Sequence, residues 1–133
     1  MIADTNAIIR AWLITRPTLT ALVGGASPRI YCPRLPENAV LPAVSFFTRG
    51  GGSSPYIPGI VTPSVQFDCW GNNPIEARQV YRALYDNLQG IQEGPYEILS
   101  AIEEAQGQDL QDVDIPNYFR TLCFFSIMIR AEA

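Results

Sequence analysis

The sequence predicts an α+β fold in which an antiparallel β-sheet carries two main α-helices on one face. Between residues 64 and 90 an alternating strand pattern leads directly into a capped amphipathic helix. A second amphipathic stretch opens the chain, and two long strand patterns close it. The 133 residues contain no internal repeat and no linker, so residues 1–133 are expected to form one domain.

The first predicted helix begins after Asp4, a residue type that caps helix N-termini. It ends at Arg16-Pro17, because the residue before a proline is pushed out of the helical conformation. Pro17 is then suited to begin a short second turn that ends at Gly24-Gly25. The apolar face of the first helix is formed by Ile8, Ile9, Trp12 and Leu13.

Two strands are predicted before residue 50. The first is short, from Arg29 to Tyr31, and the second runs from Ala43 to Arg49. The connection between them contains Pro33, Pro36 and Pro42, which exclude a regular helix or a central strand there. Because Ala43–Arg49 is apolar on both faces, we expect this strand to be covered on both sides.

Residues 50–58 form a glycine-rich segment. Glycine-rich loops can bind phosphate, but neither nucleotide-binding pattern, with G-K-[ST] or with G-x-G-x-x-G opening a helix, is present. The segment leads towards another strand, so it is predicted to be the mobile tip of a hairpin. Apolar residues on such a loop often serve a partner. Tyr56 and Ile57 are therefore candidate subunit or partner contacts.

The stretch from Ser64 to Gly90 is the clearest local pattern. Its strand, in which apolar and polar residues alternate, has one buried face. Asn73 is placed to cap the following helix, and Glu76 is placed to bond back to the N–H of Asn73. Gly90 is predicted to end the helix in a left-handed conformation. The predicted buried face of the helix comprises Ala77, Val80, Tyr81, Leu84 and Leu88.

Strand patterns at residues 96–106 and 118–130 close the chain, the first interrupted by Glu103 and Glu104. The second is apolar on both faces, so the second face of the sheet is expected to be covered by loops or by another subunit. Phe124 and Met128, on that second face, are candidate subunit contacts.

Residues 107–117 are predicted to form an acidic, solvated turn that contains Asp109, Asp112 and Asp114. The alternative of a Ca²⁺ site lacks the spacing of an EF-hand, and no metal ligand set is predicted.

The composition restricts the chemistry. Hydrophobic residues make up 47% of the chain and charged residues 17%, with a net charge of −4. All nine basic residues are arginine and there is no histidine, which argues against Ser–His and metal–His catalysis and against binding driven by phosphate contacts. Cys32, Cys69 and Cys123 are odd in number and lack metal-ligand spacing. Because Cys69 and Cys123 fall on apolar positions of strand patterns, buried free thiols are expected, with a disulfide or a thiol nucleophile as the alternative. Neither a signal peptide nor a membrane span is predicted.

Several residues with structural roles recur in a fixed order along the chain. They are Leu19 to Gly25 before Arg29-Ile30-Tyr31, then Leu41-Pro42-Ala43-Val44, then Val65, Gln66, Asp68, Trp70, Glu76, Ala77, Leu88 and Gly90. In this pattern nearly the whole chain resembles a family of small tailed-bacteriophage proteins, called tail completion, tail terminator or head–tail joining proteins. None of these residues belongs to a catalytic motif.

The resemblance implies a virion structural protein without enzymatic activity or cofactor. Members of that family form a ring, commonly a hexamer, at the head-proximal end of the tail tube. The ring stops tube polymerisation and joins the tail to the head connector. The implied partners are copies of the chain itself, a tail tube protein and a connector protein. The implied location is the virion tail, assembled in the host cytoplasm, with no membrane contact.

In such a ring, DNA would pass through the opening without specific binding. Carboxylates would repel it, whereas arginine contacts would retain it. The candidate acidic lumen consists of Glu103, Glu104, Asp109, Asp112 and Asp114. The other interpretation is that these acids lie on the outer surface and confer solubility.

The alternative function is a small hydrolase or ligand-binding domain that uses carboxylates such as Asp68 and Glu104. Two close carboxylates in a pocket would favour it. The structural interpretation of Asp68 is a pairing with Arg78, Arg82 or the N–H of a turn.

Overall fold

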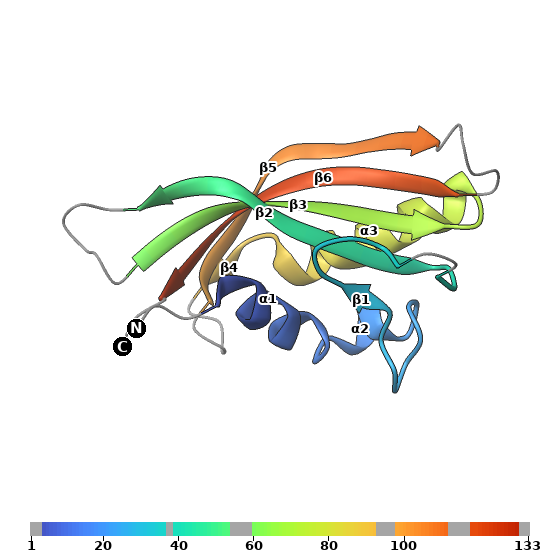
Figure 1. The fold of residues 1–133 in the computed structure, drawn as a ribbon, viewed down its shortest axis with the longest axis horizontal. Helices are drawn as coiled ribbons and strands as arrows, with labels where there is room; N and C mark the ends of the chain where they lie inside the picture. The colour runs from blue at the N-terminus through green and yellow to red at the C-terminus, as the bar shows by residue number, and fades with distance from the viewer. Residues whose placement is uncertain (1–3, 37–38, 54–59, 93–97, 112–117, 131–133) are drawn as a thin grey trace.

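The structure is a computed structural model that describes residues 4–36, 39–53, 60–92, 98–111 and 118–130. Its described part is a mixed sheet of six strands with three helices (Figure 1). The helices are α1 (Thr5–Leu13), α2 (Pro17–Thr20) and α3 (Pro74–Leu88). The strands are β1 (Ile30–Tyr31), β2 (Ala43–Ser53), β3 (Ile60–Gly71), β4 (Ile91–Gln92), β5 (Ile98–Gln111) and β6 (Phe119–Arg130).

The strand order is β1-β2-β3-β6-β5-β4. Four of the strand pairs are antiparallel, but β1 runs parallel to β2, with Ile30 opposite Val44. The prediction of an antiparallel sheet is therefore wrong at this edge. The physical reason lies in the proline-rich connection, because a long crossover lets the chain return in the same direction, which a tight hairpin does not.

The two longer helices begin as the sequence predicts, while α1 ends at Leu13, before the predicted stop at Arg16-Pro17. The Asp4 carboxylate accepts from the N–H of Asn6 at 3.0 Å, and Asn73 Oδ1 accepts from the N–H of Glu76 at 2.8 Å. Gly90 has a φ of +79°, which confirms the left-handed exit. Glu76 differs from the prediction, since its carboxylate accepts from the N–H of Asn72 rather than that of Asn73.

Two predicted loops are partly strand. Residues 50–53 belong to β2 and pair with β3 after a register shift between Thr48 and Gly51. Gly51 allows this pairing, because a Cβ there would lie 2.3 Å from the carbonyl oxygen of Thr62. Likewise, β5 continues past Glu103 to Gln111, with register shifts between residues 103 and 108. The predicted turn at residues 107–117 is therefore strand up to residue 111.

One hydrophobic core joins helices α1 and α3 to the sheet. Phe67 on β3 lies at its centre, with its ring centroid 5.6 Å from that of Phe46 and 5.7 Å from that of Phe125. The predicted buried face of α3 is confirmed at all five positions. Along β6, Cys123, Phe125, Ile127 and Ile129 are fully buried, which places Phe124 and Met128 on the other face of the sheet.

Candidate functional site

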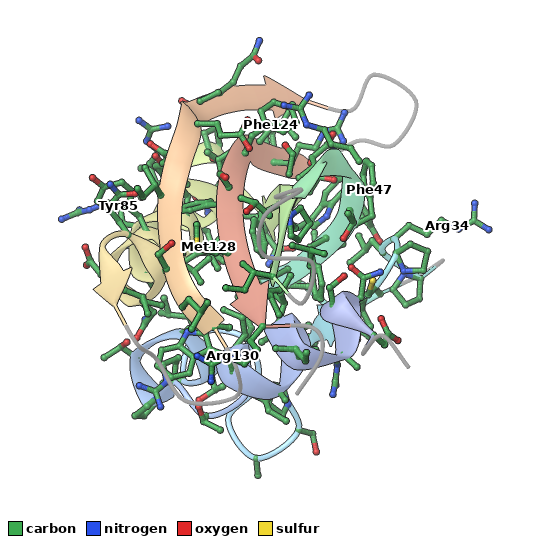
Figure 2. All side chains as sticks on the ribbon, turned by 90° about the vertical axis from the view of Figure 1, so that its left-hand side faces the viewer. Arg34, Phe47, Tyr85, Phe124, Met128 and Arg130 are labelled. Carbon is green, nitrogen blue, oxygen red and sulfur yellow. The ribbon has the colours of Figure 1, made fainter. Side chains whose placement is uncertain are left out.

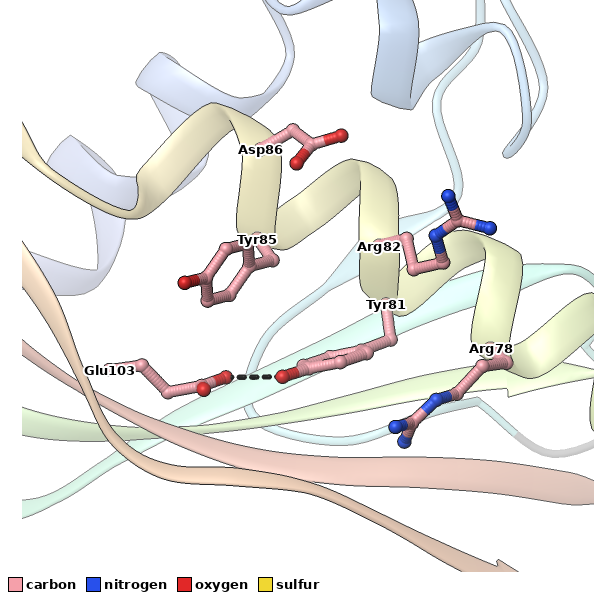
Figure 3. A pocket seen from close by; sticks show the side chains of 6 residues that line it. All are labelled: Arg78, Tyr81, Arg82, Tyr85, Asp86 and Glu103. Carbon is pink, nitrogen blue, oxygen red and sulfur yellow. Dashed lines mark hydrogen bonds between the residues drawn. The ribbon is translucent and has the colours of Figure 1, made fainter.

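A surface groove lies between α3 and β5 (Figure 3). It has a volume of about 280 Å³, and a second hollow of about 400 Å³ shares Arg78 and Arg82 in its lining. Helix α3 supplies most of the lining because its successive turns place side chains on one stripe. The first hollow is lined by Arg78, Tyr81, Arg82, Tyr85, Asp86 and Glu103.

Tyr81 connects this groove to the sheet. Its hydroxyl donates a hydrogen bond to Glu103 Oε2 at 2.6 Å and accepts one from the N–H of Gly107 at 3.1 Å. Burial, followed by the bond to Glu103, raises the pKa of Tyr81 to about 12. The phenol therefore stays protonated at neutral pH and acts as a structural donor rather than as a base.

Arg78 makes a parallel connection one turn away. Its Nη1 donates to the carbonyl oxygen of Gly107 at 3.1 Å and to Asp109 Oδ1 at 3.3 Å. The same oxygen of Asp109 accepts from the Thr121 hydroxyl at 3.0 Å. Asp109 is thus held between α3 and β6, and its carboxylate already has two donors.

The opposite side of the sheet carries a polar network around Asp68, which is only 6% exposed. Arg120 Nη1 lies 3.5 Å from Asp68 Oδ1, and the Gln66 amide donates to the same carboxylate. Burial raises the pKa of Asp68, while the charge of Arg120 and then the bond from Gln66 lower it. The prediction that Asp68 pairs with Arg78 or Arg82 is wrong. Both arginines lie on α3, whereas the Asp68 side chain is on the opposite face of the sheet and pairs with Arg120.

This second side also carries apolar residues. We use the term outer face for the surface formed by Phe47, Ile102, Leu122, Phe124 and Met128. Ile102 is 57% exposed and Met128 37% exposed, while the other three are half-buried. Figure 2 shows Phe47, Phe124 and Met128 on strands β2 and β6. Phe47 and Phe124 occupy one row of the sheet, since both are paired with Gln66.

Arg49 lies across the outer face. Its guanidinium carbon is 3.8 Å from the centroid of the Phe124 ring, and its Nη2 lies 3.9 Å from Glu104 Oε2. A guanidinium stacked on an aromatic ring and still partly exposed is common in protein interfaces, where arginine and aromatic residues are enriched.

The structure separates the predicted acidic residues. Glu103 and Asp109 face α3, whereas Glu104 faces Arg49 on the outer face. Successive residues of a strand point to opposite faces of the sheet, so these neighbouring carboxylates serve opposite sides. Four predicted contact or lumen residues, Tyr56, Ile57, Asp112 and Asp114, lie outside the described residues.

The carboxylates considered for a hydrolase also have separate partners. Asp68 pairs with Arg120 and Glu104 with Arg49. The buried thiols of Cys69 and Cys123 are free, and burial followed by the bond to Cys123 raises the pKa of Cys69 well above its usual value. A protonated, buried thiol is a poor nucleophile. Within the part of the chain that the structure describes, no three His, Cys, Asp or Glu residues form a metal site.

The sequence did not indicate the contacts of Tyr81, Arg49 and Arg120. Tyr81 has the spacing of a core residue, and nothing local links it to a strand more than twenty residues later. The alternation along β6 does place Arg120 and Phe124 on the same face of the sheet, and this was the only sequence feature that pointed to the contacts of Arg120. No helix among the described residues has the length and apolar character needed to cross a membrane.

No protein-family model matches this sequence, and no curated protein matches it significantly.

Proposed function

We propose that this chain is a structural protein of a tailed-bacteriophage virion and not an enzyme. In this proposal it forms a ring, commonly a hexamer in the family it resembles, at the head-proximal end of the tail tube. The ring ends tube polymerisation and joins the tail to the head connector. Its partners are copies of itself, the tail tube protein and a connector protein.

The observation that carries the proposal is the outer face. In the finer fold that we propose, α1 and α3 pack on one face of the sheet. In this arrangement none of the described helices covers the opposite face, where Ile102 and Met128 are exposed. Large apolar residues gathered on one face of a small domain are typical of a surface that meets another chain.

The chemistry of the outer face suits a protein partner better than a small substrate. Its aromatic and aliphatic side chains flank Gln66, and Arg49 and Glu104 lie beside them as a charged rim. An apolar centre with a polar rim is the usual anatomy of a protein interface. If the outer face meets a different surface of the next copy, repetition of this contact generates a ring when the rotation between copies closes, and that closure is part of the proposal.

The acidic lumen remains part of the proposal in a narrower form. Glu103, Glu104 and Asp109 occupy two different sides of β5, so at most one of these sides faces the opening. Glu104 shares its side with Arg49 and the outer face, and we assign it to a subunit contact. Glu103 and Asp109 are then the described residues that remain for the lumen, with DNA passing without specific binding.

Electron microscopy of negatively stained samples tests the function. The purified protein would be imaged alone and with the tail tube protein of the same virion. Rings of uniform size, seated at one end of tubes of limited length, are expected. Tubes that grow without limit in the presence of the protein, with no rings in either sample, would contradict the proposal.

A further inference from the structure

The edge of β5 is largely open. Strand β4 pairs with β5 only at Ala101 and Ser100. Beyond that point, among the described residues, β5 pairs on one side only, with β6. An open strand edge presents unpaired N–H and C=O groups, to which a strand of another molecule can bind.

Side chains of α3 and its C-terminal cap occupy these backbone groups. Gln89 Oε1 accepts from the N–H of Glu103 at 2.7 Å. The Tyr81 hydroxyl accepts from the N–H of Gly107 at 3.1 Å, and Arg78 donates to the carbonyl oxygen of Gly107 at 3.1 Å. Because the Tyr81 proton is donated to Glu103, its oxygen is free to accept from Gly107.

Gly107 makes this close approach possible. A Cβ at this position would lie 2.9 Å from Arg78 Nη1, 2.9 Å from Tyr81 Cε2 and 2.8 Å from Thr121 Cγ2. Any larger residue would push the helix side chains away from the strand. The register shifts on either side of Ala105 further distort the edge, a second feature that disfavours strand pairing.

We propose that Arg78, Tyr81 and Gln89 guard the edge of β5 against pairing with the β5 strand of a second copy. Two copies related by a two-fold axis would place the same edges opposite each other in antiparallel orientation. The guard occupies the groups that such a dimer needs. Self-association is thereby left to other surfaces, a consequence that does not rest on the proposed function.

The test removes two of the three guard residues while the outer face is disabled. Phe124→Ser and Met128→Ser form the common background, so that association through the outer face does not contribute. Tyr81→Phe and Gln89→Ala are then added together; this variant keeps Arg78 but releases the N–H groups of Glu103 and Gly107, and we call it the guard-free protein. The matched control is Arg82→Ala with Gln79→Ala, since neither of these α3 residues hydrogen-bonds to the described part of β5 and both line the hollow beside the groove.

Sedimentation velocity over a concentration series gives the dissociation constant of self-association, and hydrogen exchange follows the amides of Glu103 and Gly107. The guard-free protein is expected to self-associate at least about tenfold more tightly than the control. Its two amides should exchange faster when dilute and slower when concentrated. If Tyr81 and Gln89 only stabilise the fold, these two amides should exchange faster in the guard-free protein than in the control at every concentration.

Equal self-association of the guard-free protein and the control, with both folded by circular dichroism, would overturn the proposal. If the double substitution unfolds the chain, Gln89→Ala alone is compared with Gln79→Ala. Gln89 is the helix cap residue and lies outside the core, so its truncation leaves the packing of α3 intact. The proposal would also be overturned if these two variants self-associated equally and if the exchange of the Glu103 amide depended on concentration in the same way in both.

Discussion

The hydroxyl of Tyr81 lies 2.6 Å from the carboxylate of Glu103 and joins the middle of helix α3 to strand β5. Tyr81→Phe keeps the ring in the core and removes this bond together with the bond from Gly107. We expect a loss of about 1–2 kcal/mol in the free energy of unfolding at neutral pH. Urea denaturation of both proteins checks this, and an unchanged midpoint would show that these bonds contribute nothing net.

The raised pKa of Tyr81 also predicts that the free energy of unfolding depends on pH in the alkaline range. The pKa of Tyr81 is about 12 in the folded chain against 10 as the ordinary value, so the folded state holds the proton more tightly. Stability from this group is complete below pH 10 and falls as the pH rises towards 12. The difference between wild type and Tyr81→Phe should therefore shrink over this range. A constant difference would contradict the assignment.

The raised pKa of Asp68 predicts that its contribution to the free energy of unfolding decreases as the pH rises. Burial raises its pKa above 3.8, so the folded state binds the proton more tightly than the unfolded state does. The favourable contribution is present at low pH and is lost as the pH rises through the raised value. The unfolding free energy of wild type minus that of Asp68→Asn should fall over this range.

Phe67→Ala tests the core. The ring is fully buried between Phe46 and Phe125, and its removal should cost about 3–5 kcal/mol. Ile75→Ala removes a side chain that is 73% exposed and should change stability by less than about 0.5 kcal/mol. Chemical denaturation of the two variants checks the contrast, and similar losses would mean that the core is placed wrongly.

The sequence predicts α3 well because its signals are local. Asn73, the five buried residues and Gly90 all act within a few residues of their own positions. The strand boundaries were predicted less well. Gly50 to Ser53 and residues 107–111 read as loops, because glycine and aspartate disfavour strands unless a neighbouring strand supplies partners. That pairing is a tertiary effect, as is the parallel contact of β1 with β2.

The candidate surfaces also divide into features that local sequence patterns predict and features that depend on tertiary contacts. Alternation along β6 is sufficient to place Phe124 and Met128 on the face opposite the core. The pairing of Asp68 with Arg120 joins residues far apart in the chain, and the sequence offers several arginines as partners. The separation of Glu103 from Glu104 follows from the alternation of side chains along a strand, but it was missed because these two acids were predicted to interrupt the strand.

The central claim is that the outer face carries the contacts of self-association. Phe124→Ser with Met128→Ser removes its apolar centre, and Ile75→Ser is the control because it removes an exposed apolar residue from α3. All three proteins would first be shown to have comparable thermal unfolding.

Light scattering would then measure the molar mass of wild type, the outer-face variant and the control, each alone and with the tail tube protein. The account predicts that wild type and Ile75→Ser reach the mass of a closed ring in at least one condition, while the outer-face variant stays a monomer. A wild type that is monomeric in both conditions, or an outer-face variant that assembles as wild type does, would contradict the claim.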